Sequence, residues 1–277
     1  MLLENLLEKL ELPIEVKNQI KDYKKRNTSV CSEVLQKELK ERESWNQVIE
    51  KLKEQIGEDP FGFFILCELL DYACYTYSEY QKRGIEDIIF EQTMKFCTRF
   101  VNEHKKIYGY YAFTWAWWFP RQLTLQEFRI GALEYEFVDT VKRKIYIHIP
   151  SDADMKPECV QKSLEEYQVF LEKYYPDWAE ADWYCESWML SPALEQLLPE
   201  TSNILAFQRL FDIESVDYES MAVLDWVYPG EKTDLQELSE YTSLQRNMKK
   251  FLLAGKKVGW AEGRLMKKTN DNQPRKW

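Results

Sequence analysis

The sequence predicts an α+β protein, with an all-helical N-terminal half followed by a mixed, mostly antiparallel sheet with flanking helices. Up to about residue 118, apolar residues recur at three- and four-residue steps, which is the period of helices with one buried face. Beyond Pro120, short stretches alternate between apolar and polar residues, as strands do, with helical periods between them. Together these patterns indicate a helical half and an α+β half.

The N-terminal half is predicted to be an antiparallel helical bundle, because no strand pattern is visible and the connections are short. Its most apolar stretch, residues 59–83, predicts a buried central helix that ends at Gly84. Residues 85–109 predict one further helix. The other helices are expected in residues 2–10, 14–25, 32–42 with Ser32 as cap, and 45–56 with Gly57 as stop.

The C-terminal half is predicted to begin with a β-hairpin in residues 131–150, because two alternating stretches flank a short polar linker. A helix is expected in residues 157–178, where apolar residues step by four and three. Three more strands are expected in residues 182–190, 218–228 and 258–266. Three more helices are expected in residues 191–199, 201–211 and 234–255.

Charge argues against nucleic acid as a partner. The 277-residue chain has a net charge of −10, and residues 119–248 hold 25 acidic against 11 basic side chains. Broad nucleic-acid binding needs a basic surface instead. No apolar run is long enough to span a membrane, and the charged N-terminus does not resemble a signal peptide. The six scattered cysteines favour a reducing, cytoplasmic location.

Several common catalytic motifs are absent. The chain has no Gly-x-Gly, P-loop or Gly-x-Ser-x-Gly pattern, and its two histidines, His104 and His148, are too few for a histidine-rich zinc site. Ser187 and Ser191 have no readable His–Asp partners for nucleophilic catalysis. The tryptophans between residues 115 and 118 are expected to belong to the core or to a domain seam.

The segment "IPSDADM", residues 149–155, allows three interpretations. Asp152 and Asp154 could bind Mg²⁺, as in some phosphatases and transferases, but the further carboxylates and lysine that such a site needs cannot be assigned. Asp154, alone or with Ser151, could cap the helix that follows, with Pro157 in its first turn. The same strand-to-helix loop could also receive a phosphate group at the helix N-terminus.

His148 is the best candidate for a general base, because it lies one position before this loop on a predicted strand. A lone histidine on a strand can equally have a structural role. Glu134, Glu136 and Glu186 are carboxylates on predicted strands, where solvent exposure is the ordinary explanation. Glu186 stands out because the rest of its strand is apolar.

The order of elements resembles the GNAT acyltransferase superfamily. The segments "IHIPSDADM", "CESWMLSP", "LPETSNILAFQRLF" and "LQRNMKKFLLAG" resemble, more closely, a bacterial family. Its members join a helical N-acyltransferase N-terminal domain to a GNAT-like C-terminal domain. On this resemblance, residues 1–119 would form the helical domain, residues 120–268 the GNAT-like domain, and residues 269–277 a basic tail.

The resemblance implies that acetyl-CoA or another acyl-CoA lies in a V-shaped opening between two strands, here residues 145–150 and 183–190. Its pyrophosphate would rest on backbone N–H groups at the helix N-terminus after the first strand, with residues 151–156 as the phosphate loop. Asn203 would lie on the helix beside the pantetheine arm, together with the aromatic residues Phe207 and Phe211. The implied cofactor-binding residues are Ile149, Ser151, Asp152, Ala153, Lys156, Asn203 and Phe207.

Three departures from the superfamily pattern stand out. The loop is free of glycine and carries two aspartates, which would repel a pyrophosphate unless Lys156 offsets them. Phe207 stands where a tyrosine often protonates the departing thiolate. The spacing from Asn203 to this aromatic residue is also about one helical turn shorter.

The working hypothesis is a cytoplasmic N-acyltransferase that moves an acyl group from a CoA thioester to a small-molecule amine or a peptide, without nucleic-acid or membrane partners. His148 or Glu186 would take the amine proton, and strand N–H groups would polarise the thioester carbonyl. The rival is a non-catalytic binding module on a degenerate GNAT scaffold. A carboxylate-metal hydrolase is a third, weaker alternative.

Overall fold

The computed structural model describes residues 1–27, 37–231 and 234–266, and the chain divides into two compact units, Met1–Ile130 and Gly131–Trp277. The predicted boundary between residues 119 and 120 stays a prediction. The predicted cap Ser32 and the predicted basic tail at residues 269–277 lie outside the described residues. Within the described residues, no helix has both the length and the apolar character needed to cross a membrane.

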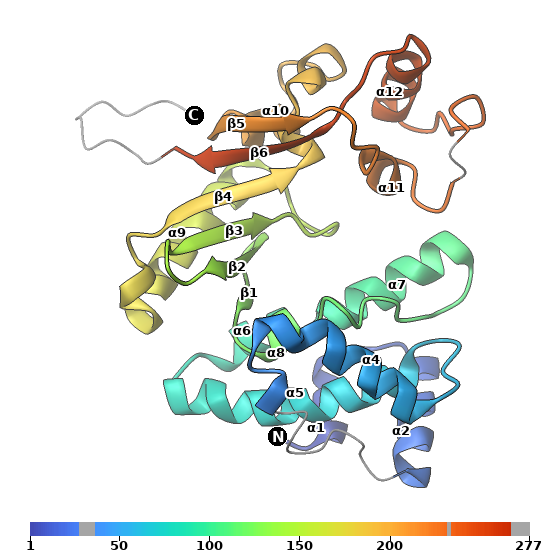
Figure 1. The fold of residues 1–277 in the computed structure, drawn as a ribbon, viewed down its shortest axis with the longest axis vertical. Helices are drawn as coiled ribbons and strands as arrows, with labels where there is room; N and C mark the ends of the chain where they lie inside the picture. The colour runs from blue at the N-terminus through green and yellow to red at the C-terminus, as the bar shows by residue number, and fades with distance from the viewer. Residues whose placement is uncertain (28–36, 232–233, 267–277) are drawn as a thin grey trace. The chain divides into compact units, whose positions relative to one another are not determined.

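The first unit is helical, and its longest described helix, α5 (Phe63–Arg83), lies at its centre (Figure 1). Eleven of the 21 residues of α5 are buried, and the helix contacts α1, α2, α4, α6 and α8. This confirms the predicted central helix, which ends at Gly84 in the left-handed conformation. The other elements are α1 (Leu3–Lys9), α2 (Ile14–Arg26), α4 (Trp45–Ile56), α6 (Asp87–Met94), α7 (Phe96–Tyr108), α8 (Pro120–Leu123) and β1 (Glu127–Ile130).

Residues 85–109 form two helices, so the prediction of one continuous helix is wrong. Helix α6 ends with Lys95 as its C-terminal cap, and α7 begins at Phe96. Phe96 stacks on Phe119, at 5.4 Å between ring centroids, and is almost fully buried. The helical period continues across the break, so the sequence pattern alone did not reveal it.

The start of α5 is fixed by the half-buried Asp59. Its carboxylate accepts hydrogen bonds from the backbone N–H groups of Phe63, Phe64 and Ile65, at 3.0, 3.0 and 2.9 Å. Three of the donors that a helix N-terminus leaves unpaired are therefore satisfied by one side chain. Burial raises the pKa of Asp59, and these backbone hydrogen bonds oppose that rise.

We expect Asp59→Ala to lower the free energy of unfolding by about 1–2 kcal/mol, the usual cost of losing a helix-capping side chain. Thermal and urea unfolding followed by circular dichroism would measure this. Asp59→Asn keeps an acceptor oxygen and should lose less. Glu58→Ala, at the exposed neighbouring position, is the control. Equal stability of Asp59→Ala and Glu58→Ala would contradict the assigned cap.

The second unit is built on a sheet with the strand order β2-β3-β4-β6-β5. Only the β3–β4 pair is parallel among these neighbouring strands; the other pairs are antiparallel. The predicted hairpin is confirmed as β2 and β3. The strands are β2 (Leu133–Asp139), β3 (Lys144–His148), β4 (Asp182–Ser187), β5 (Phe211–Asp217) and β6 (Trp260–Leu265).

One face of this sheet is covered by α9 (Pro157–Tyr174), as Figure 1 shows. Tyr167 of α9 stacks on Tyr135 of β2, at 3.8 Å between ring centroids, and meets the edge of Trp183 of β4 at 5.2 Å. Ser163 joins helix and strand further, because its hydroxyl bonds to the Tyr135 hydroxyl at 2.8 Å. Gly131 lies against Ser163, where a Cβ atom would approach to 3.0 Å. These contacts fix α9 on the sheet.

The far end of this unit departs from the sequence prediction in two places. Residues 218–228 do not form a strand; they contain the short helix α11 (Val223–Val227), with Val223, Leu224 and Val227 buried. These side chains pack into a cluster with α12 (Ser243–Leu253), and such packing overrides β propensity. Strand β5 was missed because its exposed, mostly polar stretch shows little apolar alternation.

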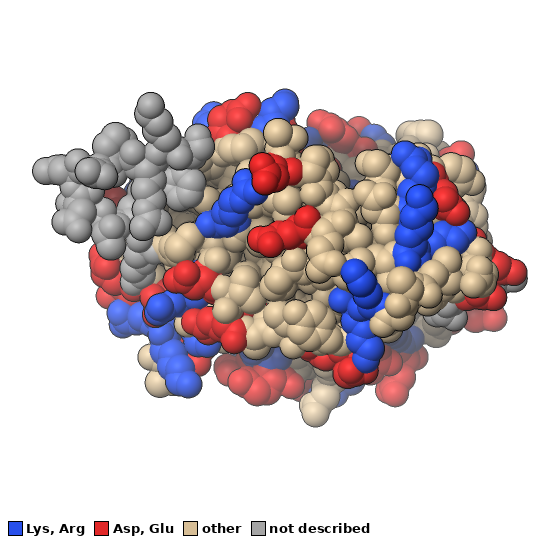
Figure 2. Space-filling model, turned by 90° about the horizontal axis from the view of Figure 1, so that it is seen from above, with Lys and Arg blue, Asp and Glu red and all other residues tan. Residues whose placement is uncertain are grey.

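Charges of both signs are interspersed on the face drawn in Figure 2, with an uncharged area between them. Outside the residues drawn in grey, this face shows no continuous basic stripe of the kind that nucleic acid requires.

Candidate active site

Strands β3 and β4 pair over a short length and then separate. Their parallel register joins three pairs: Lys144 with Asp182, Ile145 with Trp183, and Tyr146 with Tyr184. Within the described chain, the last two residues of β3 go on pairing with β2 alone, and the last three of β4 with β6 alone. Beyond Tyr146 and Tyr184 the two central strands therefore no longer pair, and this separation at their carboxyl ends is here called the opening.

The sheet face opposite α9 is polar around this opening. Paired residues share a face and neighbours along a strand alternate, so the register identifies which side chains lie together. On this face lie Glu134, Glu136, Tyr146, His148, Tyr184, Glu186, Glu262 and Arg264. The candidate bases His148 and Glu186 are therefore on the same face, one on each strand beside the opening.

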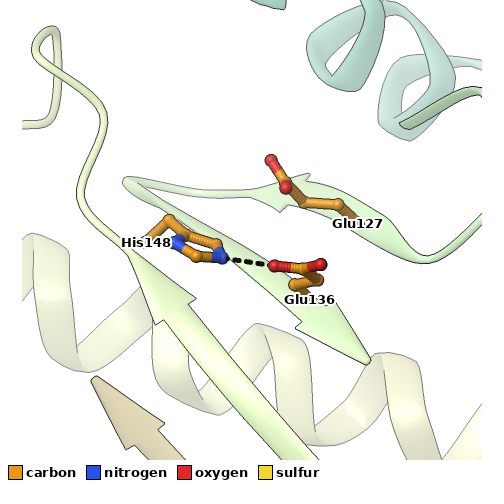
Figure 3. Close-up of side chains that lie close together, drawn as sticks. All are labelled: Glu127, Glu136 and His148. Atoms are coloured by element: carbon orange, nitrogen blue, oxygen red, sulfur yellow. Dashed lines mark hydrogen bonds and ion pairs between the residues drawn. The ribbon is translucent and has the colours of Figure 1, made fainter. Parts of the chain in front are cut away.

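His148 is held by a buried carboxylate. Its Nε2 atom lies 2.9 Å from Oε2 of Glu136, the dashed contact in Figure 3. The Glu136 side chain is 4% exposed, whereas that of His148 is 25% exposed. When Nε2 of the neutral ring donates to this carboxylate, Nδ1 is the nitrogen that can accept a proton. This is the arrangement of a histidine that is oriented for proton transfer.

Figure 3 also draws Glu127, which belongs to the first unit. Its carboxylate accepts hydrogen bonds there from Nε1 of Trp118 at 3.0 Å and from Nε2 of Gln122 at 2.7 Å. The buried charge is thus stabilised by donors close to it in sequence.

Tyr146 reaches across β4 on the same polar face. Its hydroxyl donates a hydrogen bond to Glu262 of β6, and its ring stacks beside Tyr184 at 5.9 Å. Burial raises the pKa of Tyr146, and the negative charges of Glu262 and Glu186 raise it further. Tyr146 therefore stays protonated near neutral pH and acts as a hydrogen-bond donor.

Glu186 is exposed, in agreement with its simplest interpretation from sequence.

The loop between β3 and α9 differs from the predicted helix cap. The cap position of α9 is Lys156, and no side chain caps the helix. Asp154 instead accepts hydrogen bonds from the N–H of Lys156 at 3.2 Å and from its ammonium group at 3.0 Å. The capping prediction is wrong because the cap position lies two residues after Asp154, and the N–H of Cys159 bonds to the carbonyl of Lys156 at 2.9 Å. The hydrogen bond from the Lys156 side chain also lowers the pKa of Asp154.

The remaining predicted loop residues lie between β3 and α9. Ile149 follows the last residue of β3 and is half-buried, and the exposed Ser151 and Asp152 begin the turn. The turn is closed by the N–H of Ala153, which bonds to the carbonyl of Pro150 at 2.9 Å.

The two central strands are shorter than predicted, since the sequence analysis extended them to residues 150 and 190. Strand β3 ends at His148, and β4 ends at Ser187. A short 3₁₀ turn follows β4, where the Ser187 hydroxyl accepts the N–H of Met189 at 3.1 Å. The Ser191 hydroxyl likewise accepts from Ala193 and donates to the carbonyl of Val258. Both serines therefore have structural hydrogen bonds.

A cavity of about 270 Å³ lies between the start of α9 and helix α10 (Asn203–Gln208). Its lining residues are Met155, Pro157, Val160, Gln161, Ala206, Phe207, Arg209 and Leu210. A second cavity, of about 350 Å³, shares Gln161 and Leu210 with the first and continues along α9 toward Trp183. The two cavities border the α9 face of the unit, next to the loop at residues 151–156.

The structure brings some predicted cofactor-binding residues together and separates others. Phe207 is buried and lines the first cavity, and its ring lies 5.0 Å from that of Phe211. Asn203 is exposed at the first position of α10, one turn before Phe207, and does not line that cavity. Lys156 is exposed and bonded to Asp154, so its charge is already partly compensated.

Three residues of this region were not assigned a role from the sequence. Glu136 was treated as a solvated carboxylate, although it is buried and bonded to His148. Tyr146 shares the face of His148 in the strand alternation, which was the available signal. Glu262 could not be found in this way, because it comes from β6, 116 residues further along the chain.

Comparisons with known proteins agree with this architecture. The family description "N-acyltransferase N-terminal domain" matches residues 1–125, and "GNAT-like C-terminal domain" matches residues 127–265. A search of curated proteins gives no match.

Solved structures of acyltransferases have a similar fold. One, in complex with decanoyl-CoA, is similar with a TM-score of 0.74 and 21% identity, over 95% of this chain and 86% of that chain. Another, in complex with decanoyl-CoA and teicoplanin, has a TM-score of 0.75 and the same identity and coverage. An acyltransferase variant in complex with octanoyl-CoA has a TM-score of 0.75 and 20% identity over the same shares.

The match to the GNAT-like domain alone covers half of the chain. The strand order, the parallel β3–β4 pair and the separation of these strands agree with that match. The chain therefore belongs to the family that joins an N-acyltransferase N-terminal domain to a GNAT-like C-terminal domain.

Proposed function

We propose that this protein is an N-acyltransferase that uses an acyl-CoA as co-substrate and an amine as acceptor. The observation that carries the proposal is the separation of β3 and β4 after only three parallel pairs. It leaves an opening through which a thioester can reach the polar face that carries His148. The cavity between α9 and α10 supports the same proposal, because it could receive the pantetheine arm.

Acyl-CoAs bind to similar folds, which supports this choice of co-substrate. Acyltransferases with this fold are in complexes with decanoyl-CoA and octanoyl-CoA, and one complex also contains teicoplanin. We propose for this chain an acyl-CoA and, as acceptor, an amine on a small molecule or a peptide.

In the proposed reaction, the amine nitrogen attacks the thioester carbonyl carbon and the C–S bond breaks. His148 takes the proton that the amine loses, and Glu136 orients the ring and stabilises the imidazolium. Strand N–H groups at the opening would polarise the carbonyl oxygen. The CoA thiolate leaves with the bonding electrons and takes a proton from water, because Phe207 has none to give, and the proton on the His148 imidazolium neutralises the hydroxide that remains.

Tyr146 does not serve as the acid in this scheme. Transfer of its proton would leave a phenolate beside the carboxylates of Glu262 and Glu186, and its raised pKa expresses that cost. Its role is to hold Glu262 across β4, at the last β3–β4 pair before the opening.

We expect Glu136→Gln to lower kcat by about ten- to a hundredfold with little change in acyl-CoA affinity. The amide can still contact the ring, but it cannot stabilise the imidazolium or enforce the tautomer. Steady-state kinetics at varied acyl-CoA would measure both parameters. Glu166→Gln, an exposed change on α9, is the matched control. Unchanged kcat in Glu136→Gln would remove the orienting role.

The proposed activity can be tested with a panel of primary amines. The measurement is the release of free CoA thiol from decanoyl-CoA or acetyl-CoA in the presence of each amine. Amine-dependent thiol release with an equal amount of acylated amine by mass spectrometry supports it. Stoichiometric CoA binding without any acyl transfer would favour the non-catalytic binding module instead.

A further inference from the structure

We propose that Arg209 binds a phosphate group of CoA, in place of the glycine-rich loop that this chain lacks. The inference rests on the proposed function, because it assigns a further binding residue to the same acyl-CoA site. In either case the contact joins a guanidinium to a phosphate, whether that phosphate belongs to the diphosphate or is bound to the ribose.

The loop at residues 151–156 is a poor phosphate receptor on its own. Asp152 and Asp154 bring two negative charges, and Lys156 brings one positive charge that is bonded to Asp154 at 3.0 Å. Glu158 adds another acidic side chain in the first turn of α9. CoA carries a diphosphate and a 3′-phosphate, so a positive charge from another element would favour its binding.

Arg209 is placed to supply that charge. It occupies the C-terminal cap position of α10 and lines the cavity opposite Met155 and Pro157, the residues that lead into α9. Among the residues that the structure describes, Arg209 is the one charged side chain in the lining of this cavity. A phosphate held near this end of the cavity would lie within reach of a long arginine side chain.

The backbone around Arg209 is well anchored. Its N–H bonds to the carbonyl of Leu205 at 3.1 Å, and the carbonyl of the next residue, Leu210, accepts the N–H of Met266 at 2.9 Å. Leu205 itself is buried. The side chain thus starts from a fixed point on the cavity rim while its end is exposed to solvent.

The guanidinium of Arg209 is not occupied by a carboxylate in the described part of the chain. Its Nη1 atom donates a long hydrogen bond, of 3.4 Å, to the neutral carbonyl of Glu200. Five N–H donors in a planar fork suit two phosphate oxygens better than one distant carbonyl. Exchange of this weak contact for a phosphate would therefore be favourable.

Calorimetric titration of the full-length protein with CoA, 3′-dephospho-CoA and pantetheine tests the assignment. Arg209→Ala should weaken CoA binding by about tenfold or more, since hydrogen bonds to charged groups are worth more than neutral ones. Pantetheine has no phosphate group, so its affinity should not change. Arg209→Lys keeps the charge without the fork and should lose less than Arg209→Ala.

The three ligands identify the phosphate that Arg209 contacts. A loss for CoA but not for 3′-dephospho-CoA assigns the contact to the 3′-phosphate, and a loss for both assigns it to the diphosphate. Lys162→Ala, an exposed change on α9, is the control for net charge. Thermal unfolding of each variant checks that it folds.

Two results would overturn the inference while the proposed function stands. One is CoA affinity in Arg209→Ala within twofold of the unchanged protein. The other is an equal loss for CoA and pantetheine, which would indicate a damaged cavity. A failure of the unchanged protein to bind CoA is a different outcome, because it overturns the proposed function and with it this inference.

Discussion

Replacement of His148 by alanine is expected to lower kcat/KM for acyl transfer by about a hundred- to ten-thousandfold, the usual contribution of a general base. The reason is geometric: His148 lies beside the opening, and Glu136 fixes its ring at 2.9 Å. His148 does not line the cavity proposed for pantetheine, so acyl-CoA affinity should be nearly unchanged. Initial rates of thiol release, together with calorimetry, measure the two effects separately.

The chain provides a matched control for this experiment. His104, the other histidine, lies on α7 of the first unit, and its Nδ1 atom is 2.9 Å from the carbonyl oxygen of Tyr110. His104→Ala should leave kcat/KM unchanged. If His148→Ala retains activity within about threefold of the unchanged protein, His148 is not the base. Glu186 is then the next residue to test.

The substitution Ala206→Trp should weaken acyl-CoA binding by about a hundredfold or more. Ala206 is half-buried on α10 and lines the 270 Å³ cavity next to Phe207, so an indole ring would fill much of that space. A ligand could then enter only by displacing a large apolar side chain. Calorimetric titration of the variant with decanoyl-CoA measures the loss.

The control for Ala206→Trp is a second tryptophan substitution, at a position outside the cavity. Val169 of α9 is 60% exposed and does not line either cavity described above. Val169→Trp should bind decanoyl-CoA like the unchanged protein. If Ala206→Trp also binds normally while remaining folded, the cavity between α9 and α10 does not receive the co-substrate.

The sequence predicted those parts of the fold in which a strong period coincides with burial. The β2–β3 hairpin has such a period, and α5 is the most apolar stretch of the N-terminal half; both were located correctly. The break between α6 and α7 and the helix α11 were not predictable in this way, because tertiary packing decides them. Polar strand β5 had too little alternation to be recognised.

The candidate site was predictable only in part, for a similar reason. His148 could be identified because the chain has two histidines and one lies on a strand that leads into a loop. Its partner Glu136 lies on the neighbouring strand of the hairpin, in the diagonal position, and only burial distinguishes it from a solvated glutamate. Arg209 carried no motif, and its significance depends on a cavity formed by two helices.

A calorimetric titration of the unchanged protein with decanoyl-CoA and with acetyl-CoA tests most directly whether this chain uses an acyl-CoA. The expected result is saturable binding of at least one of them, with one molecule per chain and with competition by free CoA. No detectable binding of either ligand at millimolar concentration would contradict it, because the opening between β3 and β4 would then not be an acyl-CoA site.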